Sequence, residues 1–218
     1  FCIGGSFGGG NAAQSNQATI VLKDLMGLES ASAGFIIGVI LSVLVGIIII
    51  GGIKRIASVT EKVVPLMAGL YMVACLYIIG SNITLVDDAF IQIFSEAFTP
   101  QASVGAMIGV LLIGFKRAAF SNEAGAGSAS IAHSAVKTKY SASEGLVALL
   151  EPFIDTVVIC TMTALVIIIF NSGGAFEYGV EGYEMVNGVK EMVEGSVLID
   201  GKSYEGAGIT AKAFAEYI

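Results

Sequence analysis

The chain has 218 residues, of which 55% are hydrophobic and only 13% are charged, and its mean hydropathy is +0.84. An average soluble domain carries about 25% charged residues, so this composition excludes an ordinary soluble protein and predicts a membrane protein. The formal net charge is −7, and we expect no nucleic-acid partner.

The cysteines indicate neither a metal site nor a disulfide framework. Cys2, Cys75 and Cys160 lie far apart in apolar runs, with no CxxC pair and no histidine nearby. We expect each of them to behave as a small buried hydrophobic residue.

Five stretches are long and apolar enough to cross a bilayer, whose hydrocarbon core of about 30 Å needs roughly 20 apolar residues in a helix. They are residues 1–22, 34–53, 63–80, 102–135 and 146–170. Residue 1 is a phenylalanine inside the first apolar stretch, and no charged region precedes it. We therefore expect the chain to be part of a larger, transporter-sized protein.

The first stretch is polar in its second half, where it reads GSFGGGNAAQSNQ. It lacks the lysine and hydroxyl residue that end a phosphate-binding loop, so nucleotide binding is not expected. Gln14 either faces a substrate or joins two helices by a hydrogen bond, and the residues alone leave both readings open.

The fourth stretch, 102–135, is interrupted by FKRAAFSNEAGAGSAS. Lipid offers no hydrogen-bond partners, so a break in a membrane helix is tolerated only where it faces protein or a water-filled cavity. We expect residues 102–115 to form a half-helix of about 20 Å, which would place the break near mid-membrane. Gly125 and the small residues after it favour an unwound turn, whose free backbone groups are ligands in secondary transporters. Close packing of small residues is the alternative.

The last stretch carries Asp155 and Thr156 in its first half. An acid inside a membrane helix indicates a functional site by default. A structural ion pair between Asp155 and Lys116 or Arg117 is the alternative.

The loops predict the orientation. The stretches 54–62 and 133–144 carry lysine and arginine, whereas 81–101 carries acids and no base. Because positive residues stay on the cytoplasmic side, residues 171–218 are expected on the outer side. That segment holds eight of the 18 acids, and Asp200-Gly201 predicts a short β-hairpin before a further helix that Thr210 would cap. A disordered loop is the alternative for this segment.

Four blocks, GGSFGGGNAAQSNQ, GGIKRIASVTEKVVPLMAGLYM, FKRAAFSNEAGAGSASIAHSAVKT and LLEPFIDTVVICTMTALVI, together resemble the alanine/glycine:sodium symporter family of amino-acid carrier proteins. The resemblance implies an all-α membrane protein with the leucine-transporter-type fold of two inverted five-helix repeats. The five stretches would be helices three to seven, and the broken first helix and the eighth would be missing from this chain. By resemblance, Gln14, Phe120, Ser121 and Asn122 line the substrate pocket.

These observations and the resemblance predict a multi-pass protein of the inner (plasma) membrane of a bacterium, which takes up alanine or glycine together with Na⁺. Backbone groups around Gly125 would meet the substrate, and Glu123, Asp155 and Thr156 are candidates for ion binding or gating. No enzyme activity and no cofactor besides the transported Na⁺ is expected. A cation channel or another pore-forming subunit is the alternative, although the charges form no repeated ring.

Overall fold

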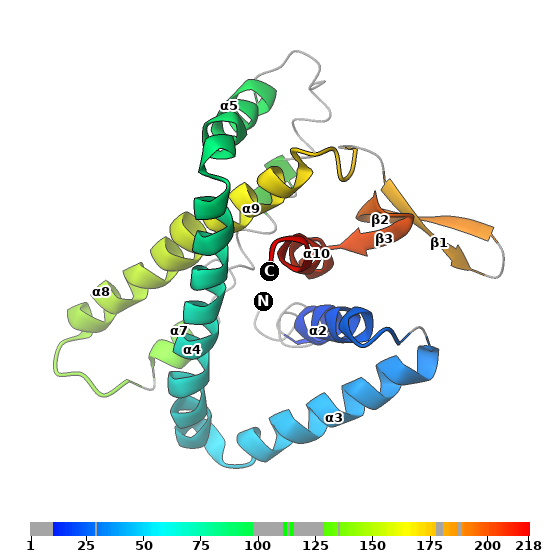
Figure 1. Cartoon of the computed structure of the whole chain (residues 1–218). Helices are drawn as coiled ribbons and strands as arrows, with labels where there is room; N and C mark the ends of the chain where they lie inside the picture. Colours follow the sequence, from blue (N-terminus) through cyan, green and yellow to red (C-terminus); the bar gives the residue numbers. More distant parts are fainter. Residues whose placement is uncertain are drawn as a thin grey trace. The chain divides into compact units, whose positions relative to one another are not determined.

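A computed structural model describes residues 11–28, 30–97, 111–112, 114–115, 129–134, 136–177, 181–186 and 189–218. Over these residues the protein is mostly helical, with one small antiparallel sheet (Figure 1). Two compact units contain them, one taking in Ile83–Leu165 and the other Ala13–Asn82 with Val166–Ile218. Three of the described helices are long and apolar enough to cross a membrane, at Ser32–Ile49, Gly52–Ser81 and Ser141–Asn171.

Helix α2 spans Ala12–Leu25 and covers the polar half of the first predicted stretch. Its end is closed by Gly27, whose φ of +63° lies in the left-handed region that glycine tolerates. The N–H of Leu28 donates to the carbonyl of Lys23 and that of Gly27 to the carbonyl of Asp24. This pair of bonds is the Schellman motif, which satisfies carbonyls that the helix end would leave unpaired.

Helix α3, Ala31–Ile49, is the most apolar of the three long helices, with a mean hydropathy of 2.7 over Ser32–Ile49. It begins where the Ser30 side chain accepts a hydrogen bond from the N–H of Ser32. Its 19 residues make a rod of about 28 Å, close to the thickness of the hydrocarbon core. Only 11% of the apolar stretch is buried in the described structure, so lipid or further protein must cover the rest.

Helix α4, Gly52–Ser81, contains the predicted span 63–80 but begins eleven residues before it. Residues 54–62, which we expected to form a loop, are helical because lysine, arginine, alanine and glutamate favour a helix and no proline interrupts them. Pro65 therefore lies inside the helix and not in its first turn. The 30 residues make about 45 Å, enough to carry the basic N-terminal turns beyond the hydrocarbon core.

A short 3₁₀ turn, η1 (Ile83–Leu85), leads into helix α5, Val86–Ala97, in a region that we expected to be a loop. Asp87 and Asp88 occupy the first turn of α5, where carboxylates favour the positive end of the helix dipole. Ile91 and Phe94 are about two-thirds exposed, at 64% and 65%. Alternation of such apolar residues with acids gives α5 an amphipathic character.

The last predicted span lies in a continuous helix of 31 residues, Ser141–Asn171. It consists of α8 (Ser141–Pro152), the π-helical stretch η2 (Phe153–Cys160) and α9 (Thr161–Asn171), and follows the short helix α7 (Ala129–His133). The helix begins five residues before the predicted boundary at residue 146. The break in its regular hydrogen bonding follows Pro152, which has no N–H to donate.

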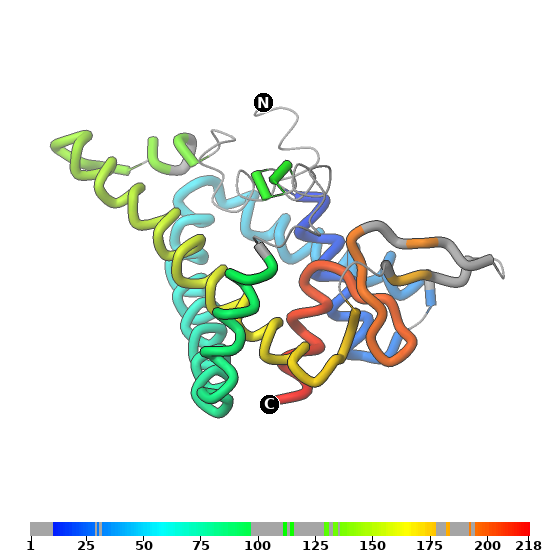
Figure 2. The backbone as a smooth tube through the Cα atoms, turned by 90° about the horizontal axis from the view of Figure 1, so that it is seen from above, coloured from blue at the N-terminus to red at the C-terminus, as the bar shows by residue number. Residues whose placement is uncertain are grey.

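The sheet has the order β1-β2-β3 and is antiparallel throughout, with strands at Glu181–Val186, Val189–Ile199 and Lys202–Glu205. Asp200 and Gly201 join β2 to β3, with φ angles of +52° and +78°. Two residues in the left-handed region give the tight turn whose twist suits a hairpin. Figure 2 shows the chain passing from β3 directly into α10.

Helix α10, Ala207–Tyr217, begins three residues before Thr210, which is therefore an interior residue and not its cap. Gly206 precedes the helix with φ of +50°. The core of this unit collects side chains from α4, the end of α9, the sheet and α10. Its buried members include Cys75, Ile78, Val166, Ile169, Phe170, Phe176, Ile199 and Ala213.

Candidate functional site

The structure describes three of the eight predicted site residues. Gln14 is exposed on α2, and Asp155 and Thr156 lie in η2. The other five lie outside the described residues, and so do both proposed partners of Asp155. The five site residues outside the description are Phe120, Ser121, Asn122, Glu123 and Gly125, and the two proposed partners are Lys116 and Arg117. Gln14 belongs to one compact unit and η2 to the other.

The π-helical stretch gives Asp155 and Thr156 an unusual backbone. A π-helix bonds each N–H to the carbonyl five residues earlier, so it is wider than an α-helix, and π-turns inside helices are frequent at functional sites. Asp155 is half-buried while Thr156 is exposed. A carboxylate and a hydroxyl are hard oxygen groups, the kind of ligand that a small cation takes in proteins.

A second cluster joins α7 to α8. Nδ1 of His133 lies 2.6 Å from Oε1 of Glu144, and Nε2 of His133 lies 3.3 Å from Oε2 of Glu151. The two glutamates are seven residues apart and therefore share one face of α8. His133 lies outside the three long helices, and its hydrogen bonds to Glu144 and then Glu151 raise its pKa above the ordinary value. The imidazolium donates at both nitrogens, so the protonated form holds both carboxylates.

This cluster lines a cavity of about 460 Å³. The other lining residues are small or carry hydroxyl groups: Ala129, Ser130, Thr138, Ser141, Gly145, Ala148 and Pro152. Thr138 Oγ1 donates to the carbonyl of Tyr140, which ties the connection to the start of α8. The cavity therefore lies beside the N-terminal end of the helix that carries Asp155.

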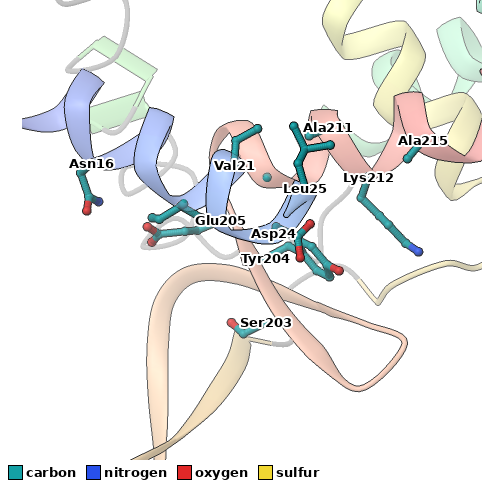
Figure 3. A pocket seen from close by; sticks show the side chains of 12 residues that line it. Asn16, Val21, Asp24, Leu25, Ser203, Tyr204, Glu205, Ala211, Lys212 and Ala215 are labelled. Carbon is teal, nitrogen blue, oxygen red and sulfur yellow. The ribbon is translucent and has the colours of Figure 1, made fainter. Parts of the chain in front are cut away.

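A cavity of about 390 Å³ lies in the other unit, between α2, β3 and α10 (Figure 3). Its apolar wall includes Val21, Leu25 and Ala211, and its polar groups include Asp24 and Ser203. At its edge the Gln17 side chain of α2 reaches the start of α10. Nε2 of Gln17 donates to Oε1 of Glu205 at 3.3 Å, and Oε1 of Gln17 accepts from the N–H of Ala207 at 2.9 Å.

Sequence reasoning missed three of these features. The spacing of Glu144 and Glu151, with His133 shortly before them, was a readable signal for a cluster on one helix face. Pro152 three residues before Asp155 was a signal for irregular backbone. The contact of Gln17 with Glu205 and Ala207 had no local signal, because about 190 residues separate the partners.

Comparison with protein families adds to this geometry. A model of the sodium:alanine symporter family matches residues 1–200. The matched residues include all three long helices. They also include α2, which carries Gln14, the stretch η2, which carries Asp155 and Thr156, and strands β1 and β2.

Individual relatives extend the comparison. The chain is 41% identical over 165 residues to the sodium/alanine symporter AgcS of Methanococcus maripaludis, covering 75% of this chain and 36% of the relative. It is 37% identical over 159 residues to the probable sodium/glutamine symporter GlnT of Bacillus subtilis (72% and 32%). It is 34% identical over 157 residues to a sodium/proton-dependent alanine carrier protein of Bacillus sp. PS3 (71% and 34%). The chain thus spans about a third of the length of the curated relatives that it matches.

Proposed function

Because the chain belongs to the sodium:alanine symporter family, we propose that it takes part in the uptake of a small neutral amino acid, alanine or glycine, by symport with Na⁺. The observation that carries this proposal is the family match over residues 1–200, on a chain whose long helices are apolar enough to cross a membrane. Members of this family are transporters and not enzymes.

The substrate site of this proposal is built around the interrupted helix. Phe120, Ser121 and Asn122, with the backbone near Gly125, would meet the ammonium and carboxylate groups of the amino acid, and Phe120 would limit the side chain. Gln14 would face the same site from α2. The exposure of Gln14 supports this role, because its amide is available to a ligand or to a neighbouring helix.

The ion path of this proposal uses acids and hydroxyls near mid-membrane. Asp155 and Thr156 are placed on it because the π-helical backbone of η2 departs from regular pairing where they lie. Glu123 in the interrupted helix would serve the same ion or gate its access. The inward Na⁺ gradient would then drive uptake as the two sets of helices alternate access to the site.

We further propose the leucine-transporter-type inverted-repeat fold, with the described long helices as parts of helices three to seven. The protein would lie in the inner membrane, with the basic N-terminal turns of α4 in the cytoplasm and the sheet outside. The acids of the sheet segment and the lysines near residues 137–139 support this orientation.

The proposal is tested by uptake of radiolabelled alanine into vesicles that contain the full-length protein, with and without an inward Na⁺ gradient. We expect saturable uptake that requires Na⁺. Replacement Asn122→Ala should raise the KM for alanine about tenfold, by loss of a hydrogen bond to a charged group. Uptake that is linear in alanine and indifferent to Na⁺ would support a channel instead.

Substrate and ion choice need a second experiment, because one relative is named a sodium/glutamine symporter and another a sodium/proton-dependent alanine carrier. Unlabelled alanine, glycine and glutamine compete for the labelled uptake, and a pH gradient replaces the Na⁺ gradient. We expect alanine and glycine to compete better than glutamine, and a pH gradient alone to give no accumulation. Stronger competition by glutamine would make glutamine, and not alanine or glycine, the preferred substrate.

A further inference from the structure

Contacts from four directions converge on α10 within the unit Ala13–Asn82 and Val166–Ile218. The rings of Tyr71 on α4 and Phe214 on α10 meet edge to face at 5.4 Å. The hydroxyl of Tyr217 donates to the carbonyl of Ile169 on α9 at 3.4 Å, and Lys212 pairs with Asp200 of the hairpin at 3.0 Å. The fourth contact is the Gln17 side chain of α2.

The Gln17 contact replaces a normal helix cap. The first N–H groups of a helix have no partner within it, and the residue before the helix usually supplies an oxygen. In α10 that residue is Gly206, which has no side chain. The oxygen comes from Gln17 instead, which accepts from the N–H of Ala207 at 2.9 Å.

The shape of the chain at Gly206 is adapted to this contact. Its φ of +50° is a conformation that glycine adopts at low cost. A Cβ at this position would lie 2.6 Å from Oε1 of Gln17, closer than packed atoms approach. Glycine at 206 therefore supplies both the turn and the space for the amide.

The chemistry of the contact requires an amide. One end of the Gln17 side chain donates to the carboxylate of Glu205 and the other accepts from the backbone N–H of Ala207. Glutamate would keep the acceptor but repel Glu205, and lysine would keep only a donor. An aliphatic residue of the same length would lose both bonds.

We propose that Gln17 is a positioning residue, which fastens the hairpin segment 189–206 and the start of α10 to α2 so that they move as one body during transport. This inference rests on the proposed function. It concerns transport because Gln14, the proposed substrate-facing residue, lies one turn before Gln17 on the same helix. A loose sheet segment would let α2 shift against α10 while the substrate site forms.

The first test joins the two sides of the contact covalently. In a cysteine-free version of the full-length protein, Gln17→Cys and Glu205→Cys are linked with a short bifunctional thiosulfonate. One-body movement predicts that the linked protein keeps at least about half of its Na⁺-dependent alanine uptake. Loss of uptake on linking, with recovery on reduction, would show that the segment must leave α2 and would overturn the proposal. Gln92→Cys with Glu96→Cys, one turn apart on α5, is the matched control pair.

The second test measures opening directly. Ser203→Cys, which lines the cavity beside Gln17, is labelled with a membrane-impermeant maleimide. Gln17→Met, similar in length but without the amide, should speed labelling about tenfold, and Gln17→Glu at least as much, because two hydrogen bonds are lost or opposed. Gln92→Met removes a Gln–Glu bond inside one helix and should change the rate by less than about twofold.

Uptake kinetics separate positioning from a general loss of fold. Gln17→Met should reach the membrane in normal amounts and raise the KM for alanine about threefold or more, because the positioned helix carries Gln14. An unchanged labelling rate in Gln17→Met, or an unchanged KM, would overturn the inference. If the unmodified protein shows no Na⁺-dependent uptake, the proposed function fails, and the labelling rates still decide whether Gln17 holds the segment.

Discussion

Helix α3 and the helix Ser141–Asn171 are almost equally apolar, with mean hydropathies of 2.7 and 2.5, but their backbones differ. Helix α3 is regular α-helix from Ala31 to Ile49. The other helix contains Pro152, Asp155 and eight residues of π-helix. Hydropathy therefore identifies both as membrane spans, while the irregular backbone and the acid distinguish the span that we assign to ion handling from the one that supports it.

The largest expected effect comes from the acid. Asp155→Asn removes a charge from η2, and because a hydrogen bond or ion contact of a charged group contributes about 1.5–3 kcal/mol, Na⁺-dependent uptake should fall about 10- to 100-fold. The matched change in α3, Ser42→Ala, should leave uptake within about twofold. The two variants are compared by their initial rates of alanine uptake at several Na⁺ concentrations. Equal effects of the two changes on uptake would contradict the assignment of ion handling to the helix Ser141–Asn171.

Proline gives the next largest effect. Pro152→Ala restores an N–H at the start of the π-helical stretch, so regular α-helix becomes possible there and Asp155 turns to another face. Uptake should fall about tenfold with normal membrane abundance. Pro65→Ala in α4 is the control, because Pro65 lies in regular helix, and its effect should be small. A Pro152→Ala protein with native kinetics would mean that the π-helical geometry has no role in transport.

The His133 cluster predicts a smaller, pH-dependent effect. Its two glutamates raise the pKa of His133, so the stabilisation is complete below the ordinary histidine pKa of about 6.5 and is lost as pH rises through the raised value. Ala148→Cys, in the cavity beside the cluster, should therefore be labelled about threefold faster at high pH, after correction for thiol ionisation. The same cysteine in a His133→Gln protein should show no such step. If the labelling rate still rises with pH in the His133→Gln protein, another titrating group causes the pH dependence.

The smallest effect concerns the cap of α3. Ser30→Ala removes the oxygen that accepts from the N–H of Ser32, at a cost of about 1 kcal/mol in stability. Thermal unfolding in detergent should shift down by a few degrees, while the KM for alanine stays unchanged. A changed KM would mean that the supporting helix also shapes the site.

The sequence allowed the membrane class and the approximate position of the long helices to be predicted, because both depend on local hydropathy. Helix ends were predicted less well. Residues 54–62 looked like a loop because they are charged, but charged residues with good helix propensity simply prolong α4 beyond the lipid. The start of α10 was missed because its capping oxygen comes from Gln17, a residue distant in sequence.

The same limit applies to the candidate site. Asp155 and Thr156 were found because polar residues in an apolar run are conspicuous, whereas the π-helical backbone that holds them is a property of hydrogen-bond geometry. Their assignment to the ion path, like that of Gln14 to the substrate, stays a prediction. The contacts of His133 with Glu144 and Glu151 were missed because the histidine and the two carboxylates lie on different helices, α7 and α8.

The central claim is coupled uptake, and accumulation against a gradient tests it most directly. Vesicles containing the full-length protein are given an inward Na⁺ gradient, with the membrane potential held at zero, and the internal and external concentrations of labelled alanine are compared at steady state. A Na⁺-coupled symporter predicts an internal concentration above the external one that collapses when a sodium ionophore is added. Equal concentrations on both sides, with or without the gradient, would contradict it.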